Sequence, residues 1–227
     1  MKRIFHHEVL DRLDEIVAPS RTAVLIIDVQ NDFCSPGGAF DKAGKNLESI
    51  RAMLAPLAEF LERARKIGVP LVYIQQTTLP EGKSDSPAWL RLKTRDGKDG
   101  QYTILGTWGH DFVDMVKPRS GDTVVRKWRS SAFTRTELDR LLKESGVETV
   151  ILTGTTTQGC VESTGRDATF HDYYAVLPVD LVATTNKELH EASLRVQAAR
   201  HELTTSAEII AAWQRTSAGS DGGKDAV

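Results

Sequence analysis

The chain has little cysteine, since its 227 residues include only two thiols, Cys34 and Cys160. Two cysteines cannot build the disulfide framework of a small secreted protein, and they fit a reducing compartment. The chain also begins with polar residues, Met1-Lys-Arg-Ile-Phe-His-His-Glu, which contain no apolar signal-peptide core. We therefore expect a cytoplasmic protein.

Long apolar runs and an excess of one charge are missing as well. The longest apolar run is a few residues, far short of the roughly 18 residues that cross a bilayer. The 29 basic residues nearly balance the 31 acidic ones, so the chain has no electrostatic footprint for nucleic acid or an anionic membrane. The composition predicts partners that are neither nucleic acids nor membranes.

A hydrophobic content of 40% suits one sizeable core, and 227 residues are short for two independent domains. We expect a single domain over residues 1–215. Residues 216–227, rich in Gly, Ser and Asp, predict a disordered tail. Residues 1–19 contain an amphipathic piece from Val9 to Val17, which is either an ordinary packing helix or an arm on a neighbouring subunit.

Apolar strand patterns alternate with helical ones along the rest of the chain. This alternation predicts a three-layer α/β/α sandwich around a doubly wound, mainly parallel sheet. Some thirty residues from Thr77 to Gly109 show no clear period and predict a lid over the site. The expected strands are Thr22–Asp28, Pro70–Gln75, Gly121–Lys127, Glu148–Thr153, Tyr174–Leu177 and a short one near Leu203. The expected helices are Leu47–Ile67, Thr134–Glu144 with Thr134 as its cap, one that starts at Cys160, Lys187–Arg200 and Ser206–Gln214.

Three of these strands end at or just before a residue with a charged or nucleophilic side chain. Asp28 ends the first strand, Lys127 ends the third, and Cys160 follows the fourth at the first turn of a helix. Ligands of open α/β sheets bind at the carboxyl ends of the strands. A helix start can also lower the pKa of a thiol from about 8.5 into the range of roughly 3.5–7.5. Cys160 is thus a candidate nucleophile.

These segments resemble the signature segments of the isochorismatase-like cysteine hydrolases. The resemblance extends from about residue 20 to 213, and within the superfamily the chain is most similar to the ureidoacrylate, biuret and N-carbamoylsarcosine amidohydrolases. The segments that carry it are Asp28 with Gln30 and Asp32-Phe33, Lys127 with Ser131-Ala-Phe133, Gly154 through Val161, Asn31 to Phe40, Ser86 to Trp89, Gly106 to Asp111, and Cys160 to Asp167.

The resemblance implies a catalytic triad of Asp28, Lys127 and Cys160. It also implies a cis peptide between Thr155 and Thr156 and an oxyanion hole made by the Thr156 and Cys160 amides. The expected reaction is hydrolysis of a C–N bond in a small ureido, N-carbamoyl or amide substrate through a Cys160 thioester, in a homodimer or homotetramer. Two alternatives stay open: a vinyl-ether hydrolase of the isochorismatase kind, against which Cys160 counts, and a non-catalytic small-molecule-binding member.

The loops that follow the first two strands suggest a substrate slot. We expect Phe33, Trp89 and Trp108 to form its walls, and Gln76 to offer an amide donor and acceptor at its rim. Arg129, two residues beyond Lys127, is a candidate partner for a substrate carboxylate.

No cofactor is expected. The nicotinamidases of this superfamily carry an Asp-x-His pattern with further histidines after the second strand, whereas this chain has Gln75-Gln-Thr-Thr78 there. The sequence therefore predicts no metal site.

Overall fold

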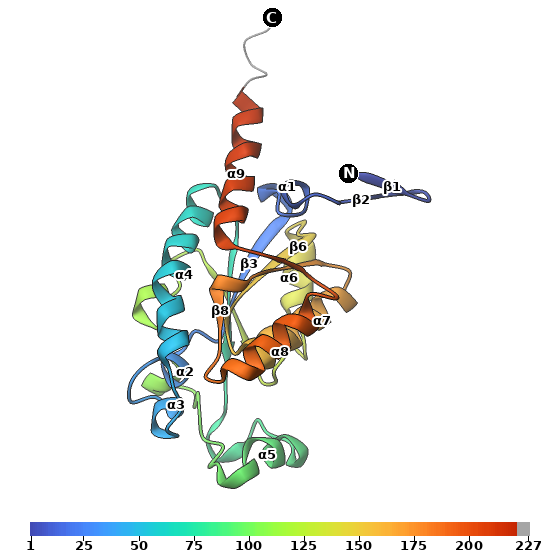
Figure 1. Ribbon diagram of the computed structural model, residues 1–227. Coiled ribbons are helices and arrows are strands. Elements are labelled where there is room, and N and C mark those ends of the chain that lie inside the picture. Colours follow the sequence, from blue (N-terminus) through green and yellow to red (C-terminus); the bar gives the residue numbers. More distant parts are fainter. Residues whose placement is uncertain (222–227) are drawn as a thin grey trace, which may run out of the picture.

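A parallel sheet forms the middle layer of the computed structural model, which describes residues 1–221 (Figure 1). Its strands follow the order β5-β4-β3-β6-β7-β9, with β8 paired to β6. Every pairing in this sheet is parallel. The strands are β3 (Thr22–Ile27), β4 (Leu71–Gln76), β5 (Thr123–Lys127), β6 (Thr149–Thr155), β7 (Tyr174–Pro178), β8 (Val182–Ala183) and β9 (Glu202–Thr204).

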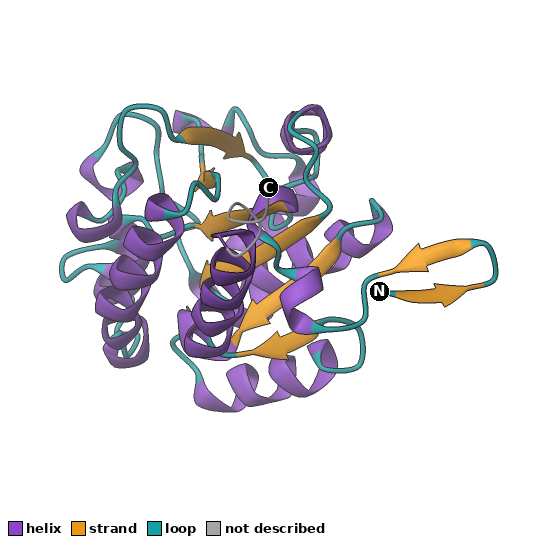
Figure 2. Cartoon of the chain, turned by 90° about the horizontal axis from the view of Figure 1, so that it is seen from above, coloured by secondary structure: helices purple, strands orange, loops and turns teal. Residues whose placement is uncertain are grey.

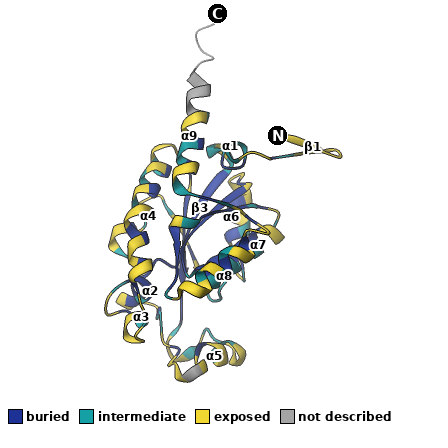
Figure 3. Cartoon of the chain, viewed as in Figure 1, coloured by how far each residue is buried: buried dark blue, intermediate teal, exposed yellow. Residues whose placement is uncertain are grey.

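Helices cover both faces of the sheet, as the α/β/α prediction requires. On one face lie α4 (Glu48–Lys66) and α9 (Ser206–Asp221), and on the other α6 (Leu138–Glu144), α7 (Glu162–Phe170) and α8 (Lys187–Gln197) (Figure 1). The central strands β3, β4 and β6 are dark blue in Figure 3 because both of their faces are buried, whereas the helices expose their outer sides. The predicted fold class is confirmed.

Strand β3 shows how the sequence produces this burial. All six of its residues are buried, with Val24 and Ile26 packed in one core and Ala23, Leu25 and Ile27 in the other. A strand covered by helices on both sides has no solvent face, so it needs no polar alternation.

The N-terminal segment differs from the prediction. Instead of a helix from Val9, residues Lys2–Ile4 (β1) and His7–Val9 (β2) pair as an antiparallel hairpin that projects from the body (Figure 2). The helix α1 covers only Leu13–Ile16. Packing does bury Leu10, Ile16 and Val17, and the Trp213 indole N–H donates to the Val17 carbonyl at 2.7 Å. The apolar segment therefore packs on the body without forming the expected helix from Val9, and its alternative role as an arm on a neighbouring subunit stays a prediction.

Two helix ends also differ. The predicted start at Thr134 is wrong, because Arg135 has a φ of +58° and α6 begins only at Leu138. Helix α9 runs to Asp221 and so extends into the expected tail, while residues 222–227 lie outside the described part; disorder of the tail stays a prediction.

The segment expected to be irregular contains the helix α5 (Pro87–Lys93). Smaller helices are α2 (Asn31–Cys34) and α3 (Ala39–Lys42) in the loop after β3. Over residues 1–221, no helix is both long and apolar enough to span a membrane.

Candidate active site

The carboxyl ends of four neighbouring strands bring the candidate residues together. Lys127 is the last residue of β5 and pairs in register with Gln76, the last residue of β4. Asp28 directly follows β3, and Cys160 follows β6, the next strand of the sheet. The shared edge predicted from the strand patterns is thus what the structure shows.

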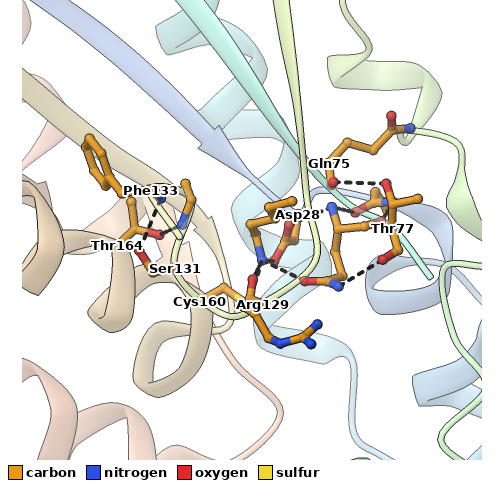
Figure 4. A network of polar contacts seen from close by, with 12 residues as sticks. Asp28, Gln75, Thr77, Arg129, Ser131, Phe133, Cys160 and Thr164 are labelled. Carbon is orange, nitrogen blue, oxygen red and sulfur yellow. Dashed lines mark hydrogen bonds and ion pairs between the residues drawn. The ribbon is translucent and has the colours of Figure 1, made fainter. Parts of the chain in front are cut away.

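The Lys127 ammonium lies at the centre of this group. Its Nζ is 2.8 Å from Asp28 Oδ2 and 3.2 Å from Cys160 Sγ. It also donates to Gln76 Oε1 at 2.9 Å and to the Arg129 carbonyl at 3.1 Å. The Lys127 and Asp28 side chains are almost wholly buried, so solvent hardly screens this ion pair. Figure 4 shows the polar network around Asp28 and Cys160.

Asp28 occupies an unusual backbone conformation. Its φ is +53°, in the left-handed region that costs a non-glycine residue about 1–3 kcal/mol and that recurs at functional sites. The backbone N–H of Gln76 donates to Asp28 Oδ1 at 3.1 Å and to Gln30 Oε1 at 2.8 Å. The Gln30 side chain therefore joins the ends of β3 and β4. These contacts hold the carboxylate toward Lys127.

Burial dominates the protonation of the site. Burial, and then the Asp28 charge, raise the pKa of the Cys160 thiol to about 12, although the Lys127 charge opposes both effects. Burial likewise raises the pKa of Asp28 against the pull of Lys127. Burial lowers the pKa of Lys127, but the charges of Asp28 and Cys160 outweigh it and raise this pKa overall. Burial and the Asp28 charge thus act against the lowering of the thiol pKa that we expected from a helix start.

The thiol sits on a wide turn rather than on an ordinary first helical turn. Residues Thr157–Val161 form one π-helical turn, and α7 begins after it, at Glu162. Gly154 lies before the turn with a φ of +102°, and a Cβ there would lie 2.2 Å from the Ile27 carbonyl oxygen. The peptide bond between Thr155 and Thr156 is cis, which confirms the geometry implied by the resemblance.

A cavity of about 250 Å³ opens at Cys160. Of the predicted site residues, it is lined by Asp28, Phe33, Gln76, Trp89, Thr156 and Cys160. The Gln76 side-chain oxygen accepts from Lys127 and its nitrogen donates to the Thr77 carbonyl at 3.3 Å, while its contact with substrate stays a prediction. Both ends of this amide are therefore engaged within the protein.

Trp108 and Arg129 are not among the residues that line this cavity, and their contact with substrate stays a prediction. The Trp108 side chain is exposed. The Arg129 guanidinium lies 5.1 Å from the centre of the Trp89 ring and donates to the Ser84 carbonyl at 3.2 Å. Arg129 thus supports Trp89 from outside the cavity.

Several lining residues were missed by sequence reasoning. Tyr102, from the segment without a clear period, lines the cavity, and its pKa is raised chiefly by burial and then by the charge of Cys160. The other missed lining residues are Phe40, Lys45, Leu92, Lys93, Lys98, Ser130, Thr155 and Gly159. The only available signal was the position of Phe40 and Lys45 in the loop that directly follows the Asp28 strand.

Asp32 connects the two loops that form the cavity mouth. Its carboxylate accepts from the Ala39 amide at 3.0 Å and from the Thr103 amide at 2.6 Å. Gly109 backs onto the same carboxylate, where an added Cβ would lie 2.3 Å away. The mouth loops are therefore fixed to each other by one acidic side chain.

Metal-ligating side chains do not cluster in the part of the chain that is described. No group of three or more His, Cys, Asp or Glu residues within 1–221 has an arrangement that could hold a metal ion.

Comparison with known proteins gives consistent similarities. Residues 22–208 match the isochorismatase domain family. The ureidoacrylate amidohydrolase RutB of Azorhizobium caulinodans is 36% identical over 174 residues, which cover 72% of this chain and 77% of that protein.

Two solved structures share the fold. A cysteine hydrolase from Pseudomonas syringae pv. phaseolicola 1448A matches with a TM-score of 0.78 and 26% identity, covering 88% of this chain and 95% of that one. The N-carbamoylsarcosine amidase of Thermoplasma acidophilum matches with a TM-score of 0.65 and 25% identity, covering 82% and 96%.

Proposed function

Because the chain belongs to the isochorismatase domain family and is an amidohydrolase of that family, we propose that it cleaves a C–N bond of a small ureido or N-carbamoyl compound with Cys160 as nucleophile. The observation that carries the proposal is the contact of one buried ammonium, Lys127, with both Asp28 and Cys160 at the cavity. An acid, a cation and a thiol at these distances supply a base, charge stabilisation and a nucleophile.

Each proton and bond has a place in this proposal. Asp28 and Cys160 both contact the Lys127 ammonium, so the carboxylate lies close enough to take the thiol proton as the sulfur attacks the carbamoyl carbon. The backbone amides of Thr156 and Cys160 donate to the resulting oxyanion. Asp28 then gives the proton to the leaving nitrogen as the C–N bond breaks, leaving an acyl group on the sulfur.

Water completes the cycle. Asp28 takes a proton from a water molecule as its oxygen attacks the thioester, which for a ureide is a thiocarbamate. The C–S bond breaks, the sulfur recovers its proton, and the second product leaves. We propose that the reaction requires no metal, because the three side chains already supply nucleophile, proton transfer and positive charge.

The test is ammonia or amine release from a panel of ureides, N-carbamoyl amino acids, an aliphatic amide and nicotinamide, together with release of the carbonyl product from a vinyl ether. The wild type is compared with Asp28→Asn and Lys127→Met, and each protein is assayed before and after dialysis against a strong chelator. We expect ureides to be preferred, both variants to lose at least about 10³-fold in kcat/KM, and chelation to have no effect.

Other outcomes discriminate against the proposal. Preference for nicotinamide would contradict the carbamoyl specificity, and cleavage of the vinyl ether alone would favour the isochorismatase type of reaction. Activity that is lost on chelation and returns only with zinc would contradict metal independence. Binding without turnover of any compound would indicate a non-catalytic member.

A further inference from the structure

The cavity that contains Cys160 is also lined by three lysines, Lys45, Lys93 and Lys98. Lys93 is neutralised, because its Nζ lies 2.9 Å from Asp85 Oδ2 and both side chains are buried. Lys98 has a polar partner of its own. Lys45 differs, since no carboxylate among the described side chains, which leave out residue 96 and residues 217–221, forms an ion pair with its ammonium.

The backbone holds Lys45 in this position. Helix α3 ends in a Schellman turn, in which the Gly44 amide donates to the Asp41 carbonyl at 2.8 Å and the Lys45 amide donates to the Phe40 carbonyl at 3.0 Å. Gly44 has the positive φ, +69°, that this turn requires. The lysine side chain therefore returns over the helix it follows.

The same turn fixes the ammonium. Lys45 Nζ lies 3.5 Å from the centre of the Phe40 ring, and that ring packs on Phe33 with 4.9 Å between centroids. Both rings line the cavity. Packing against Phe40 thus holds the Lys45 ammonium at the cavity wall.

The charge is partly buried without an anion beside it. Burial, and then the nearby charge of Lys98, lowers the pKa of Lys45. Both effects disfavour the ammonium, and both would be offset by a negative group on a ligand. A lysine ammonium pairs with a carboxylate through a charge-assisted hydrogen bond, and an N-carbamoyl or ureido compound commonly carries its negative charge as a carboxylate.

We propose that Lys45 binds a carboxylate of the substrate, so that the substrates of this site are ureido or N-carbamoyl acids rather than neutral ureas. This inference takes the scissile carbamoyl group from the proposed function. The preference for an anion is inferred separately, from the position of Lys45 in the cavity. Lys45, and not Arg129, is then the residue that determines specificity for an acid.

The experiment uses pairs of compounds that differ only in charge at one end. Ureidoacetate is paired with isobutylurea, and β-ureidopropionate with isopentylurea, because an isopropyl group has nearly the shape of a carboxylate. The ratio of kcat/KM for acid to neutral compound is measured for wild type, Lys45→Met, Lys45→Arg and Lys42→Met. Lys42 is the matched control, since it is exposed, lies on the same turn and does not line the cavity.

We expect the wild type to prefer at least one acid over its neutral partner by about tenfold or more. Lys45→Met should abolish this preference, mainly through KM, whereas Lys45→Arg should retain part of it and Lys42→Met all of it. The preference should also shrink as salt is raised. An unchanged ratio in Lys45→Met, or a wild-type preference for the neutral compounds, would overturn the inference.

Binding separates this inference from the proposed reaction. Calorimetric dissociation constants for the same pairs are measured with Cys160→Ala and with Cys160→Ala/Lys45→Met, neither of which needs to turn over substrate. A Lys45-dependent preference for the acids would support the anion site even if no ureide is cleaved by the wild type. Absence of that preference would overturn the site even if ureides are cleaved.

Discussion

The ammonium of Lys127 lies 3.2 Å from the sulfur of Cys160, in a site where burial raises the pKa of the thiol to about 12. The Lys127 charge therefore lowers the thiol pKa by less than burial raises it. In the proposed reaction Cys160 therefore starts as a thiol, and its proton passes to Asp28 as the sulfur attacks the substrate.

The two charged neighbours should have opposite effects on thiol reactivity. Asp28 raises the pKa of Cys160 and Lys127 lowers it, so Asp28→Asn should speed alkylation by iodoacetamide at a given pH, and Lys127→Met should slow it. In the wild type the rate should climb from about pH 7 to about pH 10 without a plateau. The measurement is the rate of labelling of the Cys160 peptide, with Asp114→Asn as an exposed control. A change in the same direction in both variants would contradict the electrostatic account.

Gln76 should act on rate rather than on substrate choice. Its oxygen accepts from the Lys127 ammonium at 2.9 Å, so Gln76→Leu leaves that ammonium with one acceptor fewer. We expect kcat to fall about tenfold or more for every substrate, with the order of substrates unchanged. Gln75→Leu is the control, because Gln75 is also buried but donates to the His110 carbonyl instead. A changed order of substrates in Gln76→Leu would mean that Gln76 contacts the substrate directly.

Burial of the second thiol, Cys34, should make the stability of the protein depend on pH. Burial, and then the charge of Asp28, raises the pKa of Cys34. Unfolding therefore releases a proton above the unfolded pKa of about 8.5, and stability should fall with rising pH from there, by up to about 1.4 kcal/mol per pH unit. Below that pH the thiol is protonated in both states and contributes no slope.

Urea unfolding of the wild type and Cys34→Ala between about pH 7 and about pH 10.5 measures this slope. The slope in the alkaline range should be smaller in the variant, whatever its absolute stability. Equal slopes in the two proteins would show that Cys34 titrates normally in the folded state.

Gly154 should tolerate no side chain. At this position Ala would combine an unfavourable φ of +102° with an overlap of 2.2 Å between Cβ and the Ile27 oxygen. Gly146 has a φ of +68° with nothing near it, so Gly146→Ala isolates the cost of the backbone conformation, about 1–2 kcal/mol. Gly154→Ala should lose about 1–3 kcal/mol more, measured by chemical unfolding, and should impair turnover in the folded fraction. Equal losses in the two variants would contradict the close contact of β6 with β3.

The features that were predicted correctly are those that follow from strand patterns, namely the parallel sheet and the shared edge of the three candidate residues. Asp28, Lys127 and Cys160 follow continuous apolar strands, and parallel pairing then requires their carboxyl ends to meet. The family membership expected from these segments is confirmed. The homodimer or homotetramer and the cytoplasmic location stay predictions.

The cavity walls were harder to predict because they depend on loop geometry. Trp89 and Trp108 occupy the same segment without a clear period, yet only Trp89 lines the cavity. One local signal was available: Ser86 followed by Pro87 is typical of a helix start, and the Ser86 hydroxyl accepts from the Trp89 amide at 3.2 Å. For Lys45 the sequence showed only its place in the loop after the Asp28 strand, because the position of its ammonium depends on the contact with Phe40.

The central claim is that Cys160 forms the bond to the substrate, and the rate of Cys160→Ala tests it most directly. The variant is assayed by ammonia release with a ureide that the wild type cleaves, after its fold has been checked by circular dichroism. The account predicts a loss of at least about 10⁴-fold in kcat, down to the uncatalysed rate within detection. A variant that retains a tenth or more of the wild-type kcat would contradict nucleophilic catalysis by this thiol.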